Sequence, residues 1–232
     1  MATIKNGDFV EVEYTGKVID DNFVFDTTSE KIAKELHIHN PYGLYGPAIV
    51  CIGQHQLLRG LEEELVGKEV GKEYTMKLAP EKAFGKKSTQ LLKLVPLTAF
   101  KEGNTRPEVG MQVDVDGQMG IVKTVTGGRV VVDFNHPLSS KEVEYKIKVN
   151  KVVTDDAVKV KATITLTLNM RQDRVDVSVV NGKAVVKMIK LPEPFQKEFA
   201  KRIIDVVPTI KEVVFEEKKE EKAEKQPLNR SK

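Results

Sequence analysis

The sequence predicts an α+β protein in which antiparallel β-sheet is the main component. Apolar and polar residues alternate over 8–14 and again over 143–149, which is the period of a strand with one buried face. Leucines spaced four apart over 57–65 indicate one amphipathic helix between these strands. Asp-Gly, Gly-Gly and Asn-Gly pairs follow several short apolar runs, and such pairs are typical of hairpin turns.

The N-terminal part is predicted to hold short strands and a loop. Val10, Val12 and Tyr14 share one face of the first strand, which is expected to end at the Thr-Gly pair at 15–16. The Gly and Pro content of 40–47 predicts the loop. The other elements expected here are a strand at 18–19, an extended run at 23–25, a helix from its N-cap Ser29 to Leu36, and a strand at 48–52.

The amphipathic helix combines an apolar stripe with an acidic run. Leu57, Leu61 and Leu65 lie at intervals of four, and Gly67 is expected to end the helix. A strand over 73–78 is predicted to follow. The acidic run is expected to face outward and consists of Glu62, Glu63 and Glu64.

The segment from Gly85 to about Val130 is predicted to be a small antiparallel β unit. An apolar run over 90–95 leads into a helical turn at 96–100 that begins with proline. Three strands are then expected over 111–115, 119–125 and 129–134, with turns at 116–117 and 127–128.

The C-terminal part is predicted to form a further α+β unit. Asn181-Gly182 between apolar runs is a strong hairpin signal. The predicted elements are strands at 162–168, 175–180 and 183–189, a helix at 193–206, a strand at 210–215 and a charged tail at 217–232.

Composition and charge argue against several classes of protein. Hydrophobic residues make up 40% and charged residues 31% of the chain, as in a globular protein. The net charge of +3 argues against nucleic acid as the main partner, and no apolar run is long enough to span a membrane. The lone Cys51 and the absence of a recognisable secretory leader favour a cytoplasmic location. No metal site is expected, because the four histidines are not grouped in ligand spacing: His37, His39, His55 and His136.

Four segments, taken in their order and spacing, resemble the FKBP family of prolyl isomerases. They are Val12-Glu13-Tyr14-Thr15-Gly16 with Phe25-Asp26-Thr27-Thr28, Leu57-Leu58-Arg59-Gly60-Leu61-Glu62, Ala79-Pro80-Glu81-Lys82-Ala83-Phe84-Gly85, and Val143-Glu144-Tyr145-Lys146-Ile147. The chain is still more similar to the SlyD-like branch, in which the flap carries an inserted chaperone domain and the chain returns through a segment like 133–141. It also resembles the long archaeal members, which add a C-terminal domain.

The resemblance implies a fold and a division into domains. The fold would be a half-barrel, in which an antiparallel sheet surrounds one helix. The implied divisions are an isomerase domain at 1–85 plus 131–153, an insert-in-flap chaperone domain at 86–130, a C-terminal α+β domain at 154–216 and a charged flexible tail at 217–232.

The resemblance also implies the residues of an apolar catalytic pocket. Asp26 would be its one charged group, placed near the rotating carbonyl or orienting Tyr14, and the N–H of Leu58 would bind the carbonyl next to proline. The implied catalytic set is Tyr14, Phe25, Asp26, Leu57, Leu58, Leu61, Phe84 and Tyr145. The implied substrate-binding set is Ala48, His136 and Leu138, and on the insert Leu91, Leu94, Phe100, Met111, Met119 and Ile121.

Three positions depart from the family pattern. Leu61 stands where many members have tryptophan, Phe84 where many have tyrosine, and Gln56 where a glutamate is common. Because prolyl binding rests mostly on apolar contact, it is expected to persist.

Two functions are compatible with these patterns. In the favoured hypothesis, the insert captures unfolded chain and raises the effective concentration of its prolines near the pocket. In the alternative, the isomerase pocket is degraded and the chain is a pure holdase chaperone. A separate alternative for the aromatic set is that its members are ordinary core residues. The apolar residues of the insert are expected to divide between its own core and an exposed surface, because so small a unit cannot bury all of them. The expected partners are unfolded or proline-containing polypeptides, with no cofactor, and a homodimer through the C-terminal domain is left open.

Overall fold

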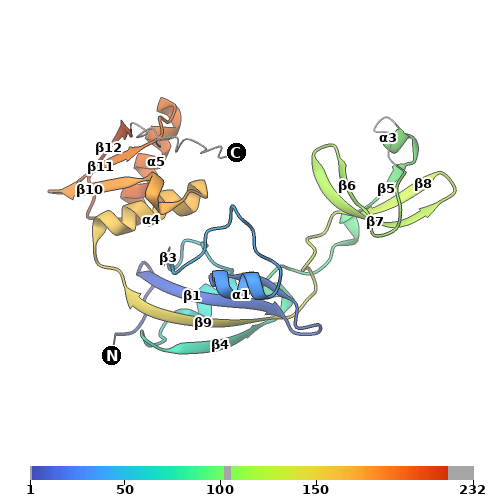
Figure 1. Cartoon of the computed structure of the whole chain (residues 1–232), viewed down its shortest axis with the longest axis horizontal. Coiled ribbons are helices and arrows are strands. Elements are labelled where there is room, and N and C mark those ends of the chain that lie inside the picture. The colour runs from blue at the N-terminus through green and yellow to red at the C-terminus, as the bar shows by residue number, and fades with distance from the viewer. Residues whose placement is uncertain (1, 102–105, 219–232) are drawn as a thin grey trace, which may run out of the picture.

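The computed structural model describes residues 2–101 and 106–218, and its first unit is an antiparallel sheet that packs on one helix (Figure 1). The strands follow the order β2-β1-β9-β4, and β3 pairs with β1 beside β2. Leu61 and Leu65 of the helix are buried against the strand residues Val12 and Ile147. The elements of this N-terminal sheet unit are β1 (Phe9–Val18), β2 (Val24–Thr27), α1 (Glu30–Glu35), β3 (Ala48–Cys51), α2 (Arg59–Leu65), β4 (Glu73–Leu78), the short 3-10 helix η1 (Pro80–Lys82) and β9 (Val143–Val152). The predicted fold class is confirmed.

The first strand is longer than the sequence pattern predicts. β1 runs without a break through the Thr-Gly pair at 15–16, where Gly16 pairs with Asp26 on one side and Tyr145 on the other. The prediction that the strand ends there is wrong. A register shift after Gly16 shows an irregularity in the ladder rather than an end.

The insert folds around its own hydrophobic cluster. Its four antiparallel strands follow the order β5-β8-β7-β6, and the predicted turns contain Asp116 and Gly117, and Gly127 and Gly128, all with positive φ. Its elements are the 3-10 helix η2 (Thr89–Leu91), β5 (Leu92–Pro96), α3 (Thr98–Lys101), β6 (Gln112–Val115), β7 (Gln118–Thr126) and β8 (Arg129–Asp133). The cluster consists of Val95, Phe100, Val113, Val122, Val130 and Val132.

The C-terminal unit is a three-stranded sheet with two helices. β10 and β11 form the hairpin predicted from Asn181-Gly182, and β12 adds to β11 in parallel. Its elements are α4 (Asp156–Leu168), the 3-10 helix η3 (Gln172–Arg174), β10 (Asp176–Val180), β11 (Lys183–Met188), α5 (Glu193–Val206) and β12 (Glu212–Glu217). Of the predicted tail at 217–232, Glu217 ends β12 and residues 219–232 lie outside the described residues.

The predicted strand at 162–168 is wrong, because these residues form the second half of α4. Asp155 caps the helix by accepting hydrogen bonds from the backbone N–H groups of Ala157 and Val158. Val160 and Ile164, four apart, are buried together, while Leu166 on the alternating pattern is partly exposed. The intervening threonines satisfy their hydroxyls inside the helix, for example Thr163 by donating to the carbonyl of Lys159 at 2.9 Å.

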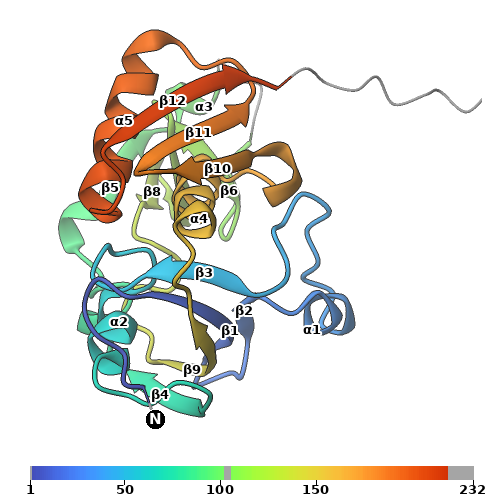
Figure 2. The ribbon, with the colours of Figure 1, turned by 90° about the vertical axis from the view of Figure 1, so that its left-hand side faces the viewer.

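The C-terminal unit shares a hydrophobic cluster with the N-terminal sheet. Phe9 of β1 and Cys51 of β3 are buried in the same cluster as Val160 and Ile164 of α4 and Ile203 of α5. Figures 1 and 2 show α4 between β3 and the C-terminal sheet, with the insert at the opposite end of the N-terminal sheet. The division into domains stays a prediction, and side-chain packing crosses its boundary at 153/154. No helix among the described residues is long and apolar enough to cross a membrane.

Candidate active site: an aromatic cleft

A solvent-open hollow of about 470 Å³ lies between α2, the β1–β2 edge and the end of β9. Its lining comes from six separate segments of the chain. It is lined by Tyr14, Phe25, Asp26, Gln56, Leu57, Leu58, Leu61, Phe84, His136, Leu138 and Tyr145. All eight residues of the expected catalytic set therefore line one hollow, which we call the cleft, together with His136 and Leu138 of the expected substrate-binding set.

The walls of the cleft are a chain of packed rings. Tyr14 and Tyr145 have ring centroids 5.8 Å apart, and Tyr145 meets Phe25 edge-on at 5.8 Å. Phe25 meets Phe84 edge-on at 5.5 Å, and Phe84 stacks on His136 at 4.7 Å with the ring planes 2° apart. Edge-to-face pairs of this kind are favourable arrangements of aromatic quadrupoles, so the rings hold one another in place.

Two glycines make the cleft possible by leaving room for its walls. A Cβ on Gly16 would lie 2.8 Å from the ring of Tyr145 and 3.0 Å from that of Phe25. A Cβ on Gly60 would lie 2.6 Å from the carbonyl oxygen of Lys82, so glycine lets α2 approach η1. The sequence pattern marked Gly16 only as a strand end. Its role depends on rings that are far away in the sequence.

Tyr14 is anchored through its backbone and its pKa is raised by burial. Its N–H donates to the Thr28 hydroxyl at 2.9 Å, and that hydroxyl donates to the Tyr14 carbonyl at 3.2 Å. Burial, with a further contribution from the nearby Asp26 carboxylate, keeps the phenol protonated by raising its pKa well above the ordinary value. Burial raises the pKa of Asp26 as well, and the Tyr14 hydroxyl beside it offsets part of this rise. Tyr14 is thus a hydrogen-bond donor at the edge of an apolar hollow.

The N–H of Leu58 is available at the floor of the cleft. Leu58 is the N-cap of α2, and its carbonyl accepts the first helical bonds, from Leu61 at 2.9 Å and Glu62 at 3.0 Å. Its own N–H has no acceptor within the described parts of the chain. A carbonyl group of a bound peptide is the partner that this donor lacks.

The expectation that Glu62 faces outward is wrong, because its side chain is buried and organises the loop before α2. Only 4% of Glu62 is exposed, and its carboxylate accepts from the N–H groups of Gly53 at 2.8 Å, His55 at 3.2 Å and Leu57 at 2.9 Å. A sequence signal was present, since Glu62 is four residues after Leu58 and three before Leu65, on the apolar stripe. Its outward-facing neighbours Glu63 and Glu64 obscured that signal.

Ala48 and the expected insert residues do not line the cleft. Ala48 lies in β3 and borders a different hollow, of about 1020 Å³, between α4 and the loop that precedes β3. On the insert, Leu94 and Met119 are more than half exposed, whereas Phe100 is 6% exposed and belongs to the insert's own cluster. Leu91 and Met111 are also exposed, and Ile121 is intermediate in exposure.

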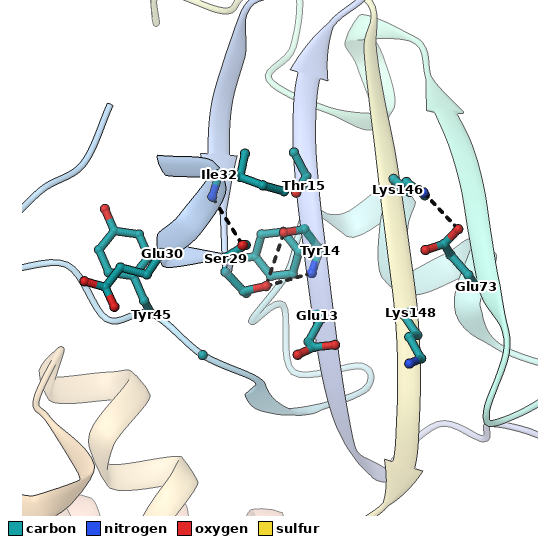
Figure 3. Close-up of a pocket in the computed structure, with 12 residues that line it drawn as sticks. Glu13, Tyr14, Thr15, Ser29, Glu30, Ile32, Tyr45, Glu73, Lys146 and Lys148 are labelled. Atoms are coloured by element: carbon teal, nitrogen blue, oxygen red, sulfur yellow. Dashed lines mark hydrogen bonds and ion pairs between the residues drawn. The ribbon is translucent and has the colours of Figure 1, made fainter. Parts of the chain in front are cut away.

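A third hollow, of about 520 Å³, opens on the polar side of the N-terminal sheet and differs in character from the cleft (Figure 3). In this view Lys146 reaches Glu73, 3.1 Å away, and the Ser29 hydroxyl accepts from the N–H of Ile32 at 3.3 Å. Most of its lining residues carry a charged or hydroxyl group, whereas leucines and aromatic rings line most of the cleft.

Comparisons with known proteins bear on the N-terminal and insert regions. A family described as FKBP-type peptidyl-prolyl cis-trans isomerase matches residues 1–99, and a family described as FKBP26, IF domain, matches residues 93–138. A short-type peptidyl-prolyl cis-trans isomerase of Methanocaldococcus jannaschii is 38% identical over 149 residues, which are 64% of this chain and 94% of that protein. An FKBP-type 16 kDa peptidyl-prolyl cis-trans isomerase of Escherichia coli K12 is 32% identical over 111 residues, covering 46% of this chain and 74% of that protein. The FKBP-type peptidyl-prolyl cis-trans isomerase SlyD of Vibrio cholerae is 36% identical over 112 residues, covering 46% and 55%.

Proposed function

The chain belongs to the FKBP family of peptidyl-prolyl cis-trans isomerases, and we propose that the aromatic cleft is where it acts. One observation supports this assignment above all. Rings and leucines from six separate segments line a single open hollow whose floor carries the N–H of Leu58, which has no acceptor among the described residues. An ordinary core of the same residues would be closed to solvent.

The reaction requires no bond to be broken. Resonance gives the peptide bond a rotation barrier of about 18–20 kcal/mol, and the two X-Pro isomers are close in energy but exchange slowly. The twisted amide separates less charge than the planar amide, so an apolar cleft disfavours the planar form relative to the transition state. Holding the proline ring fixed while the preceding carbonyl rotates supplies the remaining rate acceleration through orientation.

Each part of the cleft has a proposed part in this step. The rings of Phe25, Phe84 and Tyr145 hold the proline ring. The N–H of Leu58 binds the carbonyl on one side of the ring and keeps the peptide from turning as a whole. Asp26 orients the Tyr14 hydroxyl toward the carbonyl that rotates.

Turnover of a proline tetrapeptide tests the cleft. Phe84→Ala removes one wall ring and the stacking partner of His136, and loss of about 2 kcal/mol of contact lowers kcat/KM by about thirtyfold. The matched control is Phe195→Ala, since Phe195 is exposed on α5 and belongs to the C-terminal unit. If both variants retain full turnover while folded, the cleft is not the catalytic site.

We further propose that the insert binds unfolded polypeptide through one face of its sheet. The strand register places Leu92, Leu94 and Ile121 on the face opposite the insert's own cluster, and Met119 extends this face along β7. Leu94 is 58% exposed and Met119 55%. Exposed apolar side chains including a flexible methionine suit a surface that accepts many sequences.

Replacing the insert by a short glycine linker tests this division of labour. Because capture raises the local concentration of prolines, refolding of an unfolded protein limited by a proline step slows by about tenfold or more, while tetrapeptide turnover is unchanged. The alternative function, a holdase without isomerase activity, predicts no turnover of the tetrapeptide by the intact chain. Equal losses on both substrates contradict the proposed division.

A homodimer through the C-terminal unit is a separate proposal. β10 is an edge strand of its sheet, and Val180 at the end of this strand is largely exposed. The intact chain sediments as a dimer if two such edges pair, and Val180→Lys shifts it toward the monomer. The same mass for both proteins argues against this interface.

A further inference from the structure

Two connections join the N-terminal sheet to the insert, and they run side by side (Figure 1). The outgoing connection follows Phe84 and the returning one follows Asp133. Backbone bonds pair them at both ends, from the N–H of Phe134 to the carbonyl of Leu91 at 2.9 Å and from that of Ser140 to Gly85 at 2.8 Å. Between these two bonds, the pairing depends on side chains.

Between these two backbone bonds, the side-chain amide of Asn135 links the two connections by hydrogen bonds. Its Oδ1 accepts from the N–H of Ser88 at 2.8 Å, and its Nδ2 donates to the carbonyl of Ser88 at 3.0 Å. The side chain thereby makes the pair of bonds that a neighbouring strand would make with one residue. This requires a donor and an acceptor on one planar group, which only a primary amide provides among side chains of this length.

Asp133 fixes the orientation of this amide. It is 6% exposed, and its Oδ1 accepts from the N–H of Asn135 at 3.0 Å and from its Nδ2 at 2.8 Å. Because a carboxylate only accepts, it determines which end of the amide carries the hydrogens. Lys87 on the outgoing connection and Lys123 of β7 lie 3.8 and 3.9 Å from its other oxygen. Both connections and the insert sheet therefore meet at one group.

The two connections that Asn135 joins lead directly into the wall of the cleft. The next residue after Asn135 is His136, which stacks on Phe84, and both line the cleft. The hydroxyl of Ser139 donates to the Phe84 carbonyl at 3.1 Å. Asn135 and Ser88 themselves lie outside the cleft lining.

We propose that Asn135 is a positioning residue for catalysis on protein substrates. Its bonds to Ser88 hold the insert at one orientation beside the cleft, so that a chain bound on the apolar face presents its prolines to the aromatic rings. Effective concentration depends on how well the geometry of the two sites matches, and it falls when one site samples many orientations. This inference rests on the proposed function of the insert.

The test compares Asn135→Ala with Ser88→Ala in the full chain. Ser88→Ala is the matched control, since the Ser88 side chain makes only a 3.3 Å bond to the N–H of Gln90 and the bonds from Asn135 go to backbone. For Asn135→Ala, KM for an unfolded protein rises by about fivefold with kcat retained, and kcat/KM for a tetrapeptide stays within about twofold. Ser88→Ala changes neither. Distances between spin labels on β7 and β4 broaden only in the Asn135 variant.

Three outcomes decide the matter. Unchanged KM for the protein substrate, or unchanged spin-label distances, overturns the role of Asn135. Equal losses on both substrates overturn it as well, because they indicate damage to the cleft. If removal of the whole insert leaves catalysis on the unfolded protein substrate unchanged, it is the proposed function of the insert that is contradicted. If Asn135→Ala does not fold, Asn135→Asp replaces it in the test. This variant keeps the size of the side chain but replaces the donating Nδ2 by an oxygen that faces Asp133.

Discussion

The insert and the C-terminal unit differ in what crosses their junctions with the N-terminal sheet. At the insert junction the contacts are polar: an amide, a carboxylate, two lysines and a few backbone bonds. The insert's hydrophobic cluster contains no residue of the N-terminal sheet. At the C-terminal junction, Phe9 and Cys51 of the N-terminal sheet are buried in the cluster of the C-terminal unit.

This difference has a thermodynamic consequence. Polar contacts at a junction can exchange for water at small net cost, so a unit joined by them keeps its own fold when the junction is cut. A shared apolar cluster loses its packing if either side is removed, and the loss scales with the area exposed. We therefore expect the insert to be separable and the C-terminal unit to fold together with the isomerase sheet.

Truncation after residue 153 should have the largest effect on stability. It removes α4 and α5 and exposes Phe9, Cys51 and Ile49, which now contact them. Loss of packing around one buried aromatic residue alone costs about 3–5 kcal/mol, a large part of the stability of a typical domain. Thermal unfolding of the fragment should begin well below that of the intact chain. An unchanged midpoint would mean that the shared cluster contributes little.

A pair of phenylalanine variants should sharpen the comparison without deleting anything. Phe9→Ala creates a cavity in the shared cluster and should destabilise the isomerase and C-terminal units together by about 3–5 kcal/mol in one calorimetric transition. Phe100→Ala should unfold the insert alone, since Phe100 is buried in the insert's own cluster, and tetrapeptide turnover should be retained. If tetrapeptide turnover is lost at a temperature at which only the insert of the Phe100→Ala variant has unfolded, the insert does not unfold independently of the isomerase unit.

Glu62→Gln should give an intermediate effect confined to the isomerase unit. The carboxylate of Glu62 accepts three backbone bonds from the loop that carries Leu57, and an amide turns one acceptor into a donor. The free energy of unfolding should fall by about 1–3 kcal/mol, with faster amide exchange at Gly53 and Leu57. The control is Glu64→Gln, since Glu64 is a partly exposed neighbour on the same helix. Equal effects for the two variants would contradict the role assigned to Glu62.

The smallest effect on stability is expected for Asp26→Asn. Unlike the variants above, it should stabilise the folded state at neutral pH. Burial raises the pKa of Asp26 in the folded state. The contribution of the protonated Asp26 carboxyl group to stability is therefore fully present below the unfolded-state pKa and is lost as the pH rises through the folded-state pKa. At neutral pH the charge therefore lowers the free energy of unfolding. Asp26→Asn should raise the unfolding midpoint at neutral pH and leave it unchanged at acid pH, while tetrapeptide turnover falls about tenfold. A lower midpoint at neutral pH would reverse this account.

Much of the fold could be predicted because its signals are local. The alternation over 143–149, the hairpin pair Asn181-Gly182 and the helix at 193–206 each depend on neighbouring residues, and the structure confirms all three. The grouping of Tyr14, Phe25, Phe84 and Tyr145 was expected only through resemblance. Nothing in their spacing requires that they meet.

The sequence by itself determined the periods, the turns and which residues share one face within β1 and within β9. Only the tertiary structure decided that 162–168 is helix, that Glu62 is buried, and that Phe9 and Cys51 belong to the C-terminal cluster. The physical reason is that a periodic pattern shows which residues share a face, whereas burial of that face depends on what packs against it. That partner comes from distant chain, and its contribution to the free energy outweighs local propensity.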